Sequence, residues 1–319
     1  MSSSNLLPWL EPHWKFFLER LAQDRMAHAI MIEGPAGSGK NALAVAMVAK
    51  LLCSSDQPDA CGQCRSCKLL EGGGAHPDRF ELHPEEDSKI IKVDQIRQLI
   101  GSLNLTTSVS EKKVAYIHPA DVMNNNAANA LLKSLEEPTG DAVMILVSSD
   151  TSRLPVTIRS RCQSIVINQP EQQQALDWLA TTRDRPAQDL NAALQAAGGS
   201  PLRALHYLDS PQLDAFRSVT SGLADLLNRP ASASMVAARL GDLDEDDVWR
   251  WLSMCSAEAV KSVLSGQSIP WLQASAGLQG KALFDLQRKA DINRRMSASS
   301  VRGDLLLQDW LIRWAEQKF

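Results

Sequence analysis

The sequence predicts an α/β domain with a mostly parallel sheet in its first half, followed by segments that are entirely helical. Up to about residue 168, short apolar strands alternate with amphipathic helices, an order that places parallel strands between layers of helices. Beyond that point the apolar residues recur only at helical spacing. The sequence therefore predicts an α/β domain with all-α segments behind it.

The elements of the first half follow from their apolar periodicity. Residues 12–25 carry one apolar helical face, and 29–32 form a short buried strand that runs into a glycine-rich loop and an apolar helix at 41–52. Further strands are expected at 79–83, 113–117, 142–147 and 164–167, and further helices at 91–103 and 126–136. Pro138 ends the last of these helices, because proline cannot continue one.

The second half reads as helices throughout. They are expected at 171–180 and 189–197, from Pro201, and then at 212–228, 232–240, 245–264, 280–296 and 303–317. We place domain boundaries near 168 and 208, which gives domains at 1–168, 169–208 and 209–319.

Length and composition bound the class of protein. The chain has 319 residues, a length that corresponds to two or three domains. Of these residues 44% are hydrophobic and 22% are charged, as is usual for globular proteins. The net charge of −4 provides no general basic field for nucleic acid. No apolar stretch approaches the ~20 residues that span a bilayer, and the first residues do not resemble a signal peptide. We therefore expect a cytoplasmic protein with reduced cysteines.

Residues 34–40 read Gly-Pro-Ala-Gly-Ser-Gly-Lys, which is typical of a phosphate-binding loop. In such loops, backbone N–H groups and the helix N-terminus hold the phosphates, and the lysine bridges the outer ones. Gly34, Gly37, Gly39 and Lys40 meet these requirements.

The residues that would hold magnesium are missing. The position after the lysine normally supplies a hydroxyl to the metal, and here it is Asn41. A carboxylate is also expected after strand 113–117, which is followed by His118 and Pro119, with Asp121 further on. We therefore predict no ATP hydrolysis by this chain alone. Nucleotide binding stays open, with an empty inherited turn as the alternative.

Four closely spaced cysteines follow this helix: Cys53, Cys61, Cys64 and Cys67. Four thiolates form a closed tetrahedral zinc site, so the spacing predicts structural Zn²⁺. An iron–sulfur cluster and free thiols are the alternatives. Cys162 and Cys255 lie far away in the sequence and are expected to be unligated.

Three further motifs complete a pattern that resembles the AAA+ clamp-loader family. They are Asn129-Ala-Leu-Leu-Lys-Ser-Leu-Glu-Glu-Pro138, Ser148-Ser-Asp150, and Leu154-Pro-Val-Thr-Ile-Arg-Ser-Arg-Cys162. The cysteine spacing resembles that of bacterial members. The resemblance covers residues 1–168 and, more weakly, the helical remainder. It implies a RecA-like AAA+ P-loop domain with a zinc module at 53–67, a small helical lid domain and an all-helical collar that oligomerises.

Two kinds of bacterial subunit in this family carry the cysteines. Tau/gamma motor subunits keep an intact magnesium site, whereas delta-prime subunits have it eroded but keep the Ser-Arg-Cys motif. Asn41, His118 and Pro119 make this sequence similar to the delta-prime branch. Lys40 departs from the most eroded examples of that branch.

The resemblance implies that Arg161 is an arginine finger that acts in the ATP site of a neighbouring motor subunit. Weaker candidates are Arg153 and Arg159 for the finger, Ser148 or Ser149 for a sensor, and Arg203 for either a second sensor or a plain surface residue. The implied partners are tau/gamma, the delta subunit and, through the complex, the sliding clamp and primed DNA. The chain would be a part of a DNA-directed DNA polymerase complex without a catalytic activity of its own.

Three questions stay open. If this chain instead hydrolyses ATP as a motor subunit, Asp121 or Glu136 would supply the carboxylate that is missing after strand 113–117. A DNA-binding zinc module is disfavoured by the acidic chain, which has only Arg65 and Lys68 near the cysteines. The C-terminal tryptophans are either interface anchors or core residues; they are Trp249, Trp251, Trp271, Trp310 and Trp314.

Overall fold

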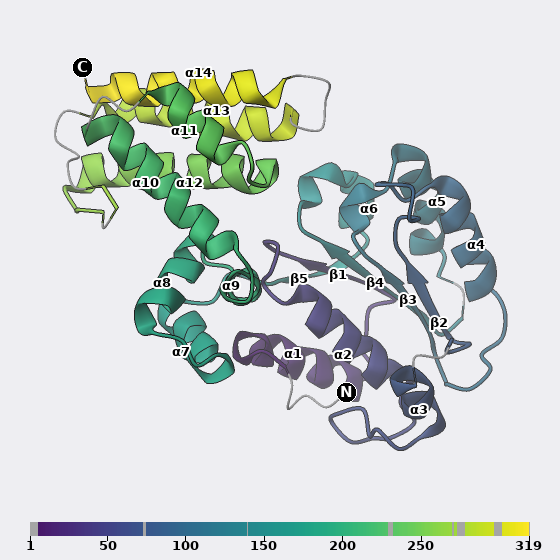
Figure 1. Cartoon of the computed structure of the whole chain (residues 1–319). Helices are drawn as coiled ribbons and strands as arrows, with labels where there is room; N and C mark the ends of the chain where they lie inside the picture. Colours follow the sequence, from purple (N-terminus) through teal and green to yellow (C-terminus); the bar gives the residue numbers. More distant parts are fainter. Residues whose placement is uncertain are drawn as a thin grey trace. The chain divides into compact units, whose positions relative to one another are not determined.

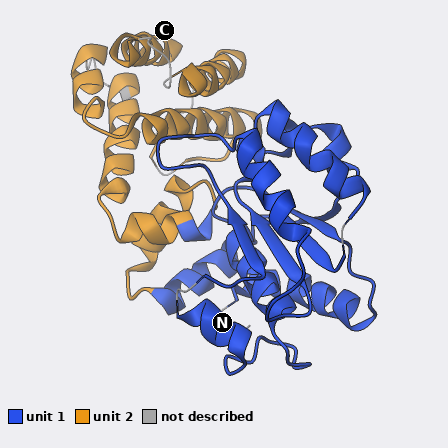
Figure 2. Cartoon of the chain, turned by 90° about the vertical axis from the view of Figure 1, so that its right-hand side faces the viewer, with its two compact units in different colours: residues 1–182, 200–202 blue, residues 183–199, 203–319 orange. Residues whose placement is uncertain are grey.

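A computed structural model describes residues 6–72, 75–138, 140–228, 232–269, 271–272, 278–296 and 302–318. Residues 1–5, which belong to the segment that does not resemble a signal peptide, lie outside the described residues. The described residues form two compact units (Figure 2). The first unit holds the residues up to 182 together with 200–202, and the second holds 183–199 and the residues from 203 onward.

The first unit is built on a five-stranded sheet in the order β2-β3-β4-β1-β5 (Figure 1). The strands are β1 (Ala29–Glu33), β2 (Arg79–Leu82), β3 (Lys113–Ile117), β4 (Ala142–Ser148) and β5 (Gln163–Val166). Every pair of neighbouring strands is parallel; Ile30 of β1, for example, lies opposite Ile145 of β4. The predicted parallel α/β fold is confirmed.

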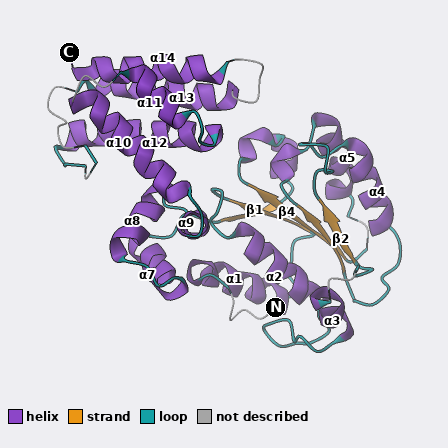
Figure 3. Ribbon diagram, in the orientation of Figure 1, coloured by secondary structure: helices purple, strands orange, loops and turns teal. Residues whose placement is uncertain are grey.

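Helices cover both faces of this sheet (Figures 1 and 3). They are α1 (Glu11–Ala22), α2 (Lys40–Leu52), α3 (Arg65–Glu71), α4 (Val93–Leu103), α5 (Asn125–Glu136), α6 (Val156–Arg159) and α7 (Gln172–Thr182). One core joins α1 and α2 to the sheet through residues such as Phe17 and Met47. The other joins α4 and α5 to the opposite face through residues such as Ile96 and Leu131. The described part of this unit also has short 3₁₀ turns at Pro8–Leu10, Ala120–Val122 and Thr151–Arg153.

The second unit is helical in the part of it that the structure describes, apart from one isolated bridge between Ile269 and Leu272. Its helices are α8 (Ala187–Ala196), most of α9 (Pro201–Leu208), α10 (Gln212–Asn228), α11 (Ala233–Leu240), α12 (Glu245–Ser265), α13 (Gly280–Met296) and α14 (Gly303–Ala315), followed by a 3₁₀ turn at Glu316–Lys318. Among the described helices of the chain, none combines the length and the apolar character that a bilayer crossing requires.

Four tryptophans form the centre of this helical unit. Trp249, Trp251, Trp310 and Trp314 are each at most 1% exposed. The indole N–H of Trp310 donates to the carbonyl of Leu286 at 2.9 Å, and that of Trp314 donates to the carbonyl of Leu223 at 3.0 Å. The two indoles also stack on each other, with ring centroids 5.5 Å apart. These four side chains are therefore core residues, whereas Trp271 is only half-buried.

Candidate functional site

The glycine-rich loop has the backbone of a phosphate-binding loop. It joins β1 to the N-terminus of α2, and Gly37 and Gly39 have φ angles of 76° and 93°, which favour glycine. A Cβ atom on Gly34 would lie 2.0 Å from the carbonyl oxygen of Ile167, at the end of β5. The structure thus brings the predicted glycines together in one loop. Gly34 is required there because the loop passes too close to the backbone of Ile167 for a side chain.

Lys40 folds back onto this loop. Its Nζ atom donates hydrogen bonds to the carbonyl oxygens of Gly34 and Pro35, at 2.6 and 2.7 Å. The side chain is buried, and burial lowers the pKa of Lys40 to about 8, against the opposing effect of the Asp121 charge. In this structure the lysine therefore closes the loop by bonding to its carbonyls.

An N-terminal segment covers the loop. The indole N–H of Trp9 donates to the carbonyl oxygen of Ser38 at 2.7 Å, and Ser38 is fully buried. A Cβ atom on Gly39 would lie 2.5 Å from Leu7 Cδ1. Sequence reasoning did not place this segment on the loop, because an apolar run before a helix carries no signal of its partner.

The positions expected to hold magnesium carry other chemistry. Asn41 is exposed in the first turn of α2. His118 follows β3, and burial, followed by the positive charge of Lys40, lowers its pKa. Asp121 accepts a hydrogen bond from the backbone N–H of Ser149 at 3.1 Å. The place of the usual carboxylate pair is therefore taken by an imidazole and a proline, and the nearest aspartate already has a backbone partner.

The four cysteines converge on one point. Cys53 follows α2, Cys61 and Cys64 lie on the loop before α3, and Cys67 lies within α3. Their sulfur atoms all lie within 4.8 Å of one another. Two of the separations are 4.0 Å, between Cys61 and Cys67, and 3.9 Å, between Cys64 and Cys53. Four thiolates at ~2.3 Å from one zinc ion would lie ~3.8 Å apart, so the donor set fits a tetrahedral metal.

Backbone amides are directed at these sulfur atoms. The N–H of Cys61 donates to Cys53 Sγ at 3.3 Å, and the N–H of Cys64 donates to Cys61 Sγ at 3.3 Å. Burial opposes ionisation of Cys64, but hydrogen bonds with Cys67 and Ser54 outweigh it and lower the pKa of this thiol to about 6. Such amides stabilise thiolates, which are the form that binds metal. Burial, in contrast, raises the pKa of the Cys67 thiol to about 12. It is the convergence of the four sulfur atoms that enables them to hold a metal ion.

The other two cysteines do not join this cluster. Burial raises the pKa of the half-buried Cys162 thiol to about 12, and it raises that of the buried Cys255 thiol as well. Both thiols lie outside the group of four converging cysteines.

A polar network links the cysteine module to the end of α2 and to the loop before β3. The hydroxyls of Ser66, in α3, and Ser110 lie 2.9 Å apart, and Ser110 also donates to the carbonyl of Leu52 at 3.0 Å. Beside it, the carboxylate of Asp78 accepts three backbone N–H bonds from residues 108–110, at 2.7 to 2.8 Å. This network was not predicted, because its members are scattered in sequence and belong to no motif.

Arg161 lies just after α6 on the surface of the first unit. Its Nη2 atom forms an ion pair with Glu136 Oε1 at 2.7 Å, and Nη1 donates to the carbonyl of Thr157 at 3.0 Å. The arginine side chain is 36% exposed, so the guanidinium can be reached from solvent. Arg153 and Arg159 are exposed as well.

The two serines of the expected sensor region lie at the end of β4. Ser148 is buried, and its hydroxyl accepts the backbone N–H of Asp150 at 3.2 Å. Ser149 is exposed, and its backbone N–H is the partner of Asp121 described above. Both side chains thus sit at the carboxyl edge of the sheet.

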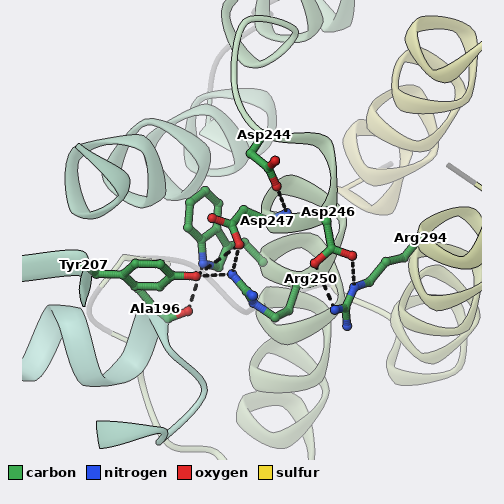
Figure 4. Close-up of polar contacts among 8 residues, drawn as sticks. Ala196, Tyr207, Asp244, Asp246, Asp247, Arg250 and Arg294 are labelled. Atoms are coloured by element: carbon green, nitrogen blue, oxygen red, sulfur yellow. Dashed lines mark hydrogen bonds and ion pairs between the residues drawn. The ribbon is translucent and has the colours of Figure 1, made fainter. Parts of the chain in front are cut away.

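Arg203 belongs to the second unit and lies in a cluster of charged groups on α9, α12 and α13. Burial, followed by the charge of Arg250, lowers its pKa. Figure 4 shows the neighbouring contacts, in which Arg250 bonds to Tyr207 and Asp247. In the same view, Arg294 pairs with Asp246 through two bonds of 2.8 and 3.0 Å. The Arg203 side chain itself is half-buried.

Comparison with known proteins identifies the family. The family model described as "DNA polymerase III, delta subunit" matches residues 9–171, slightly more than half of the chain. The chain is 36% identical over 312 residues to "DNA polymerase III subunit delta'" of Pseudomonas aeruginosa, covering 97% of this chain and 90% of that protein. It is 30% identical over 318 residues to the protein of the same name from Escherichia coli, with 96% and 94% covered.

A tau/gamma subunit is also related, but over a shorter region. "DNA polymerase III subunit tau/gamma" of Haemophilus influenzae is 29% identical over 209 residues, which cover 64% of this chain and 30% of that protein. The delta' relatives, in contrast, match along nearly the whole of both chains. This chain belongs to the delta-prime subunit family of bacterial DNA polymerase III.

Proposed function

We propose that this chain is a non-hydrolysing subunit of the DNA polymerase III clamp loader, which helps to load the sliding clamp on primed DNA. The observation that carries the proposal is the combination of a preserved phosphate loop with a dismantled magnesium site. Asn41, His118 and Pro119 stand where a hydroxyl and two carboxylates would be needed. Without a metal to neutralise charge on the transferring phosphoryl group, the loop has no means to drive hydrolysis.

The chain contributes to hydrolysis in a neighbouring subunit through Arg161. A guanidinium that reaches a transferring phosphoryl group is worth about 10³-fold or more in rate. Two features support this role: the exposure of the Arg161 side chain and its fixed position between Glu136 and Thr157. Arg153 and Arg159 stay weaker candidates.

The four cysteines hold a structural zinc ion. Cys53, Cys61, Cys64 and Cys67 supply four soft donors and leave no ligand position for a substrate. Because Ser66 in α3 bonds to Ser110, such an ion would help to fix α3 against the loop before β3.

The partners of this subunit are the tau/gamma motor subunits and the delta subunit, with the clamp and primed DNA reached through the complex. The family relationship to delta' and tau/gamma proteins supports this assembly. We assign residues 1–168 to the P-loop domain, 169–208 to a lid and 209–319 to the oligomerising collar.

A motor subunit is the second candidate function, and the retained Lys40 and loop glycines are what favour it. The test is ATP turnover by the purified chain alone with magnesium, with Lys40→Ala as the contamination control. Turnover at the level of the control is expected. Turnover that disappears in Lys40→Ala would overturn the proposal and make this chain a motor.

The role of Arg161 is tested in the assembled complex. Arg161→Ala should assemble normally and should lower ATP hydrolysis by the complex by about the fraction that the site receiving this arginine contributes. Arg97→Ala, which removes an exposed arginine on α4 that has no proposed role, is the matched control. Equal rates for Arg161→Ala and the control would exclude the arginine-finger role.

A further inference from the structure

The contact between Arg161 and Glu136 joins two separate elements of the first unit. Glu136 is the last residue of α5, whereas Arg161 follows α6. The ion pair measures 2.7 Å between Nη2 and Oε1, and the second contact of the guanidinium goes to the carbonyl of Thr157, on α6, at 3.0 Å. The guanidinium is thus held from two directions before any partner binds.

This pair is poorly placed to stabilise the fold. The two side chains are 36% and 50% exposed, and exposed ion pairs contribute little to stability because water and salt screen them. What the pair does fix is a long side chain with several rotatable bonds, which would otherwise have to be ordered during the reaction. Its effect is therefore on the direction of the guanidinium.

The geometry leaves the guanidinium able to bind an anion. Arginine carries five N–H donors in a planar fork. The contacts to Glu136 and Thr157 engage one side of Nη2 and one side of Nη1. The remaining donors can meet the oxygens of a phosphoryl group while both contacts persist.

We propose that Glu136 is a positioning residue, which holds Arg161 in the orientation required at the ATP site of the neighbouring subunit. The inference rests on the proposed arginine-finger function of Arg161. In this role Glu136 acts through Arg161 alone. This role differs from that of a displaced hydrolytic carboxylate, which would act within this chain.

The test uses the complete clamp-loader complex with Glu136→Gln, which keeps the size and an oxygen acceptor but removes the charge. We expect kcat for ATP hydrolysis at the affected site to fall about two- to fivefold, the range of an exposed ion pair. KM for ATP should not change, because the arginine is needed in the transition state. Glu137→Gln removes the same charge from the next, exposed residue and should leave kcat unchanged.

A double-mutant cycle separates positioning from other roles. In the Arg161→Ala background, Glu136→Gln should have no further effect, because there is no guanidinium left to hold. A loss of the same size in both backgrounds would overturn the inference, and so would an increase in rate, which would mean that Glu136 masks the arginine. If Arg161→Ala itself hydrolyses normally, the proposed function fails and the positioning role falls with it. If Arg161→Ala is slow and Glu136→Gln is normal, only the positioning role is lost.

Discussion

The ammonium nitrogen of Lys40 lies 2.6 Å from the carbonyl oxygen of Gly34, at the far end of the same loop. The lysine therefore fastens the loop to itself, and burial lowers its pKa from 10.5 to about 8. Because the folded chain gives up this proton at a lower pH than the unfolded chain does, Lys40 makes the stability of the fold depend on pH.

The sign of this dependence can be predicted. Between about pH 8 and pH 10.5 the unfolded chain binds more protons at Lys40 than the folded chain does, so this residue makes the free energy of unfolding rise with pH. We expect the free energy of unfolding of the wild-type protein, relative to that of Lys40→Met, to increase as the pH rises through this window. Urea unfolding of both proteins at several pH values measures the difference.

The exposed Lys89→Met is the matched control for this experiment, since it removes a lysine that the fold does not bury. The difference between the original protein and the control should be flat with pH. An equally flat difference for Lys40→Met would contradict the burial of Lys40 in the protein in solution.

Loss of the metal should destabilise the first unit. Cys64→Ser removes one of the four converging sulfur atoms, and the folding free energy of a small metal module comes largely from its metal. We expect about one zinc ion per chain in the original protein, loss of that zinc in the variant, and a decrease of roughly 3 kcal/mol or more in the free energy of unfolding. Metal analysis and urea unfolding measure the two effects.

Cys162→Ser tests whether the effect belongs to the cluster. This thiol is half-buried but lies outside the group of four, so its variant should keep a full complement of zinc. A visible absorption band with bound iron, in place of zinc, would instead favour an iron–sulfur cluster.

The sequence predicted those parts of the fold that repeat a pattern over many residues. The helices α2, α5 and α12 were placed to within about two residues, because each carries an apolar stripe over three or more turns. The helices α3 and α6 were missed, since seven and four residues are too few to show a stripe. Their positions depend on tertiary contacts: α3 on the cysteine cluster and α6 on the packing of Ile158.

Within the candidate site, motifs predicted which residues matter but not what each one contacts. The spacing of the cysteines was sufficient to place them together, as the structure confirms. Nothing in the spacing indicated that Lys40 would turn onto Gly34, or that Glu136 would pair with Arg161. Both contacts depend on side-chain conformations and on elements brought together by the sheet, and a one-dimensional pattern does not encode these.

Asp78 is expected to be important for the loop that leads into β3. The residue is fully buried, and its carboxylate accepts three backbone N–H bonds at 2.7 to 2.8 Å. Burial would raise its pKa, but these bonds, with Ser110 first, outweigh burial and lower it. Asp78→Asn should therefore lower the free energy of unfolding by about 2 kcal/mol or more. One of the two accepting oxygens becomes an amide nitrogen that cannot accept a bond, and the bonds that remain go to a neutral acceptor.

The pH dependence of the Asp78 effect provides a second check. A carboxyl group whose pKa is lower in the folded state stabilises the fold above its ordinary pKa and loses this effect as the pH falls. The difference between the original protein and Asp78→Asn should thus shrink as the solution becomes acidic. Asp87→Asn, at an exposed position, should show neither effect. Equal stability of both variants at neutral pH would argue against the three bonds.

Because Trp314 is buried, we expect its replacement to destabilise the isolated chain. Its ring is fully buried, and its N–H donates to the carbonyl of Leu223, which joins α14 to α10. Trp314→Phe keeps an aromatic ring but removes the indole donor to that carbonyl and leaves a cavity in the core, at a cost of about 1–3 kcal/mol. Urea unfolding of the purified chain, without partner subunits, measures this cost.

Phe284→Leu, on the exposed side of α13, should change stability by less than about 0.5 kcal/mol. If Trp314→Phe instead left the isolated chain unchanged and weakened only its assembly with other subunits, the ring would be an interface anchor and not part of this core.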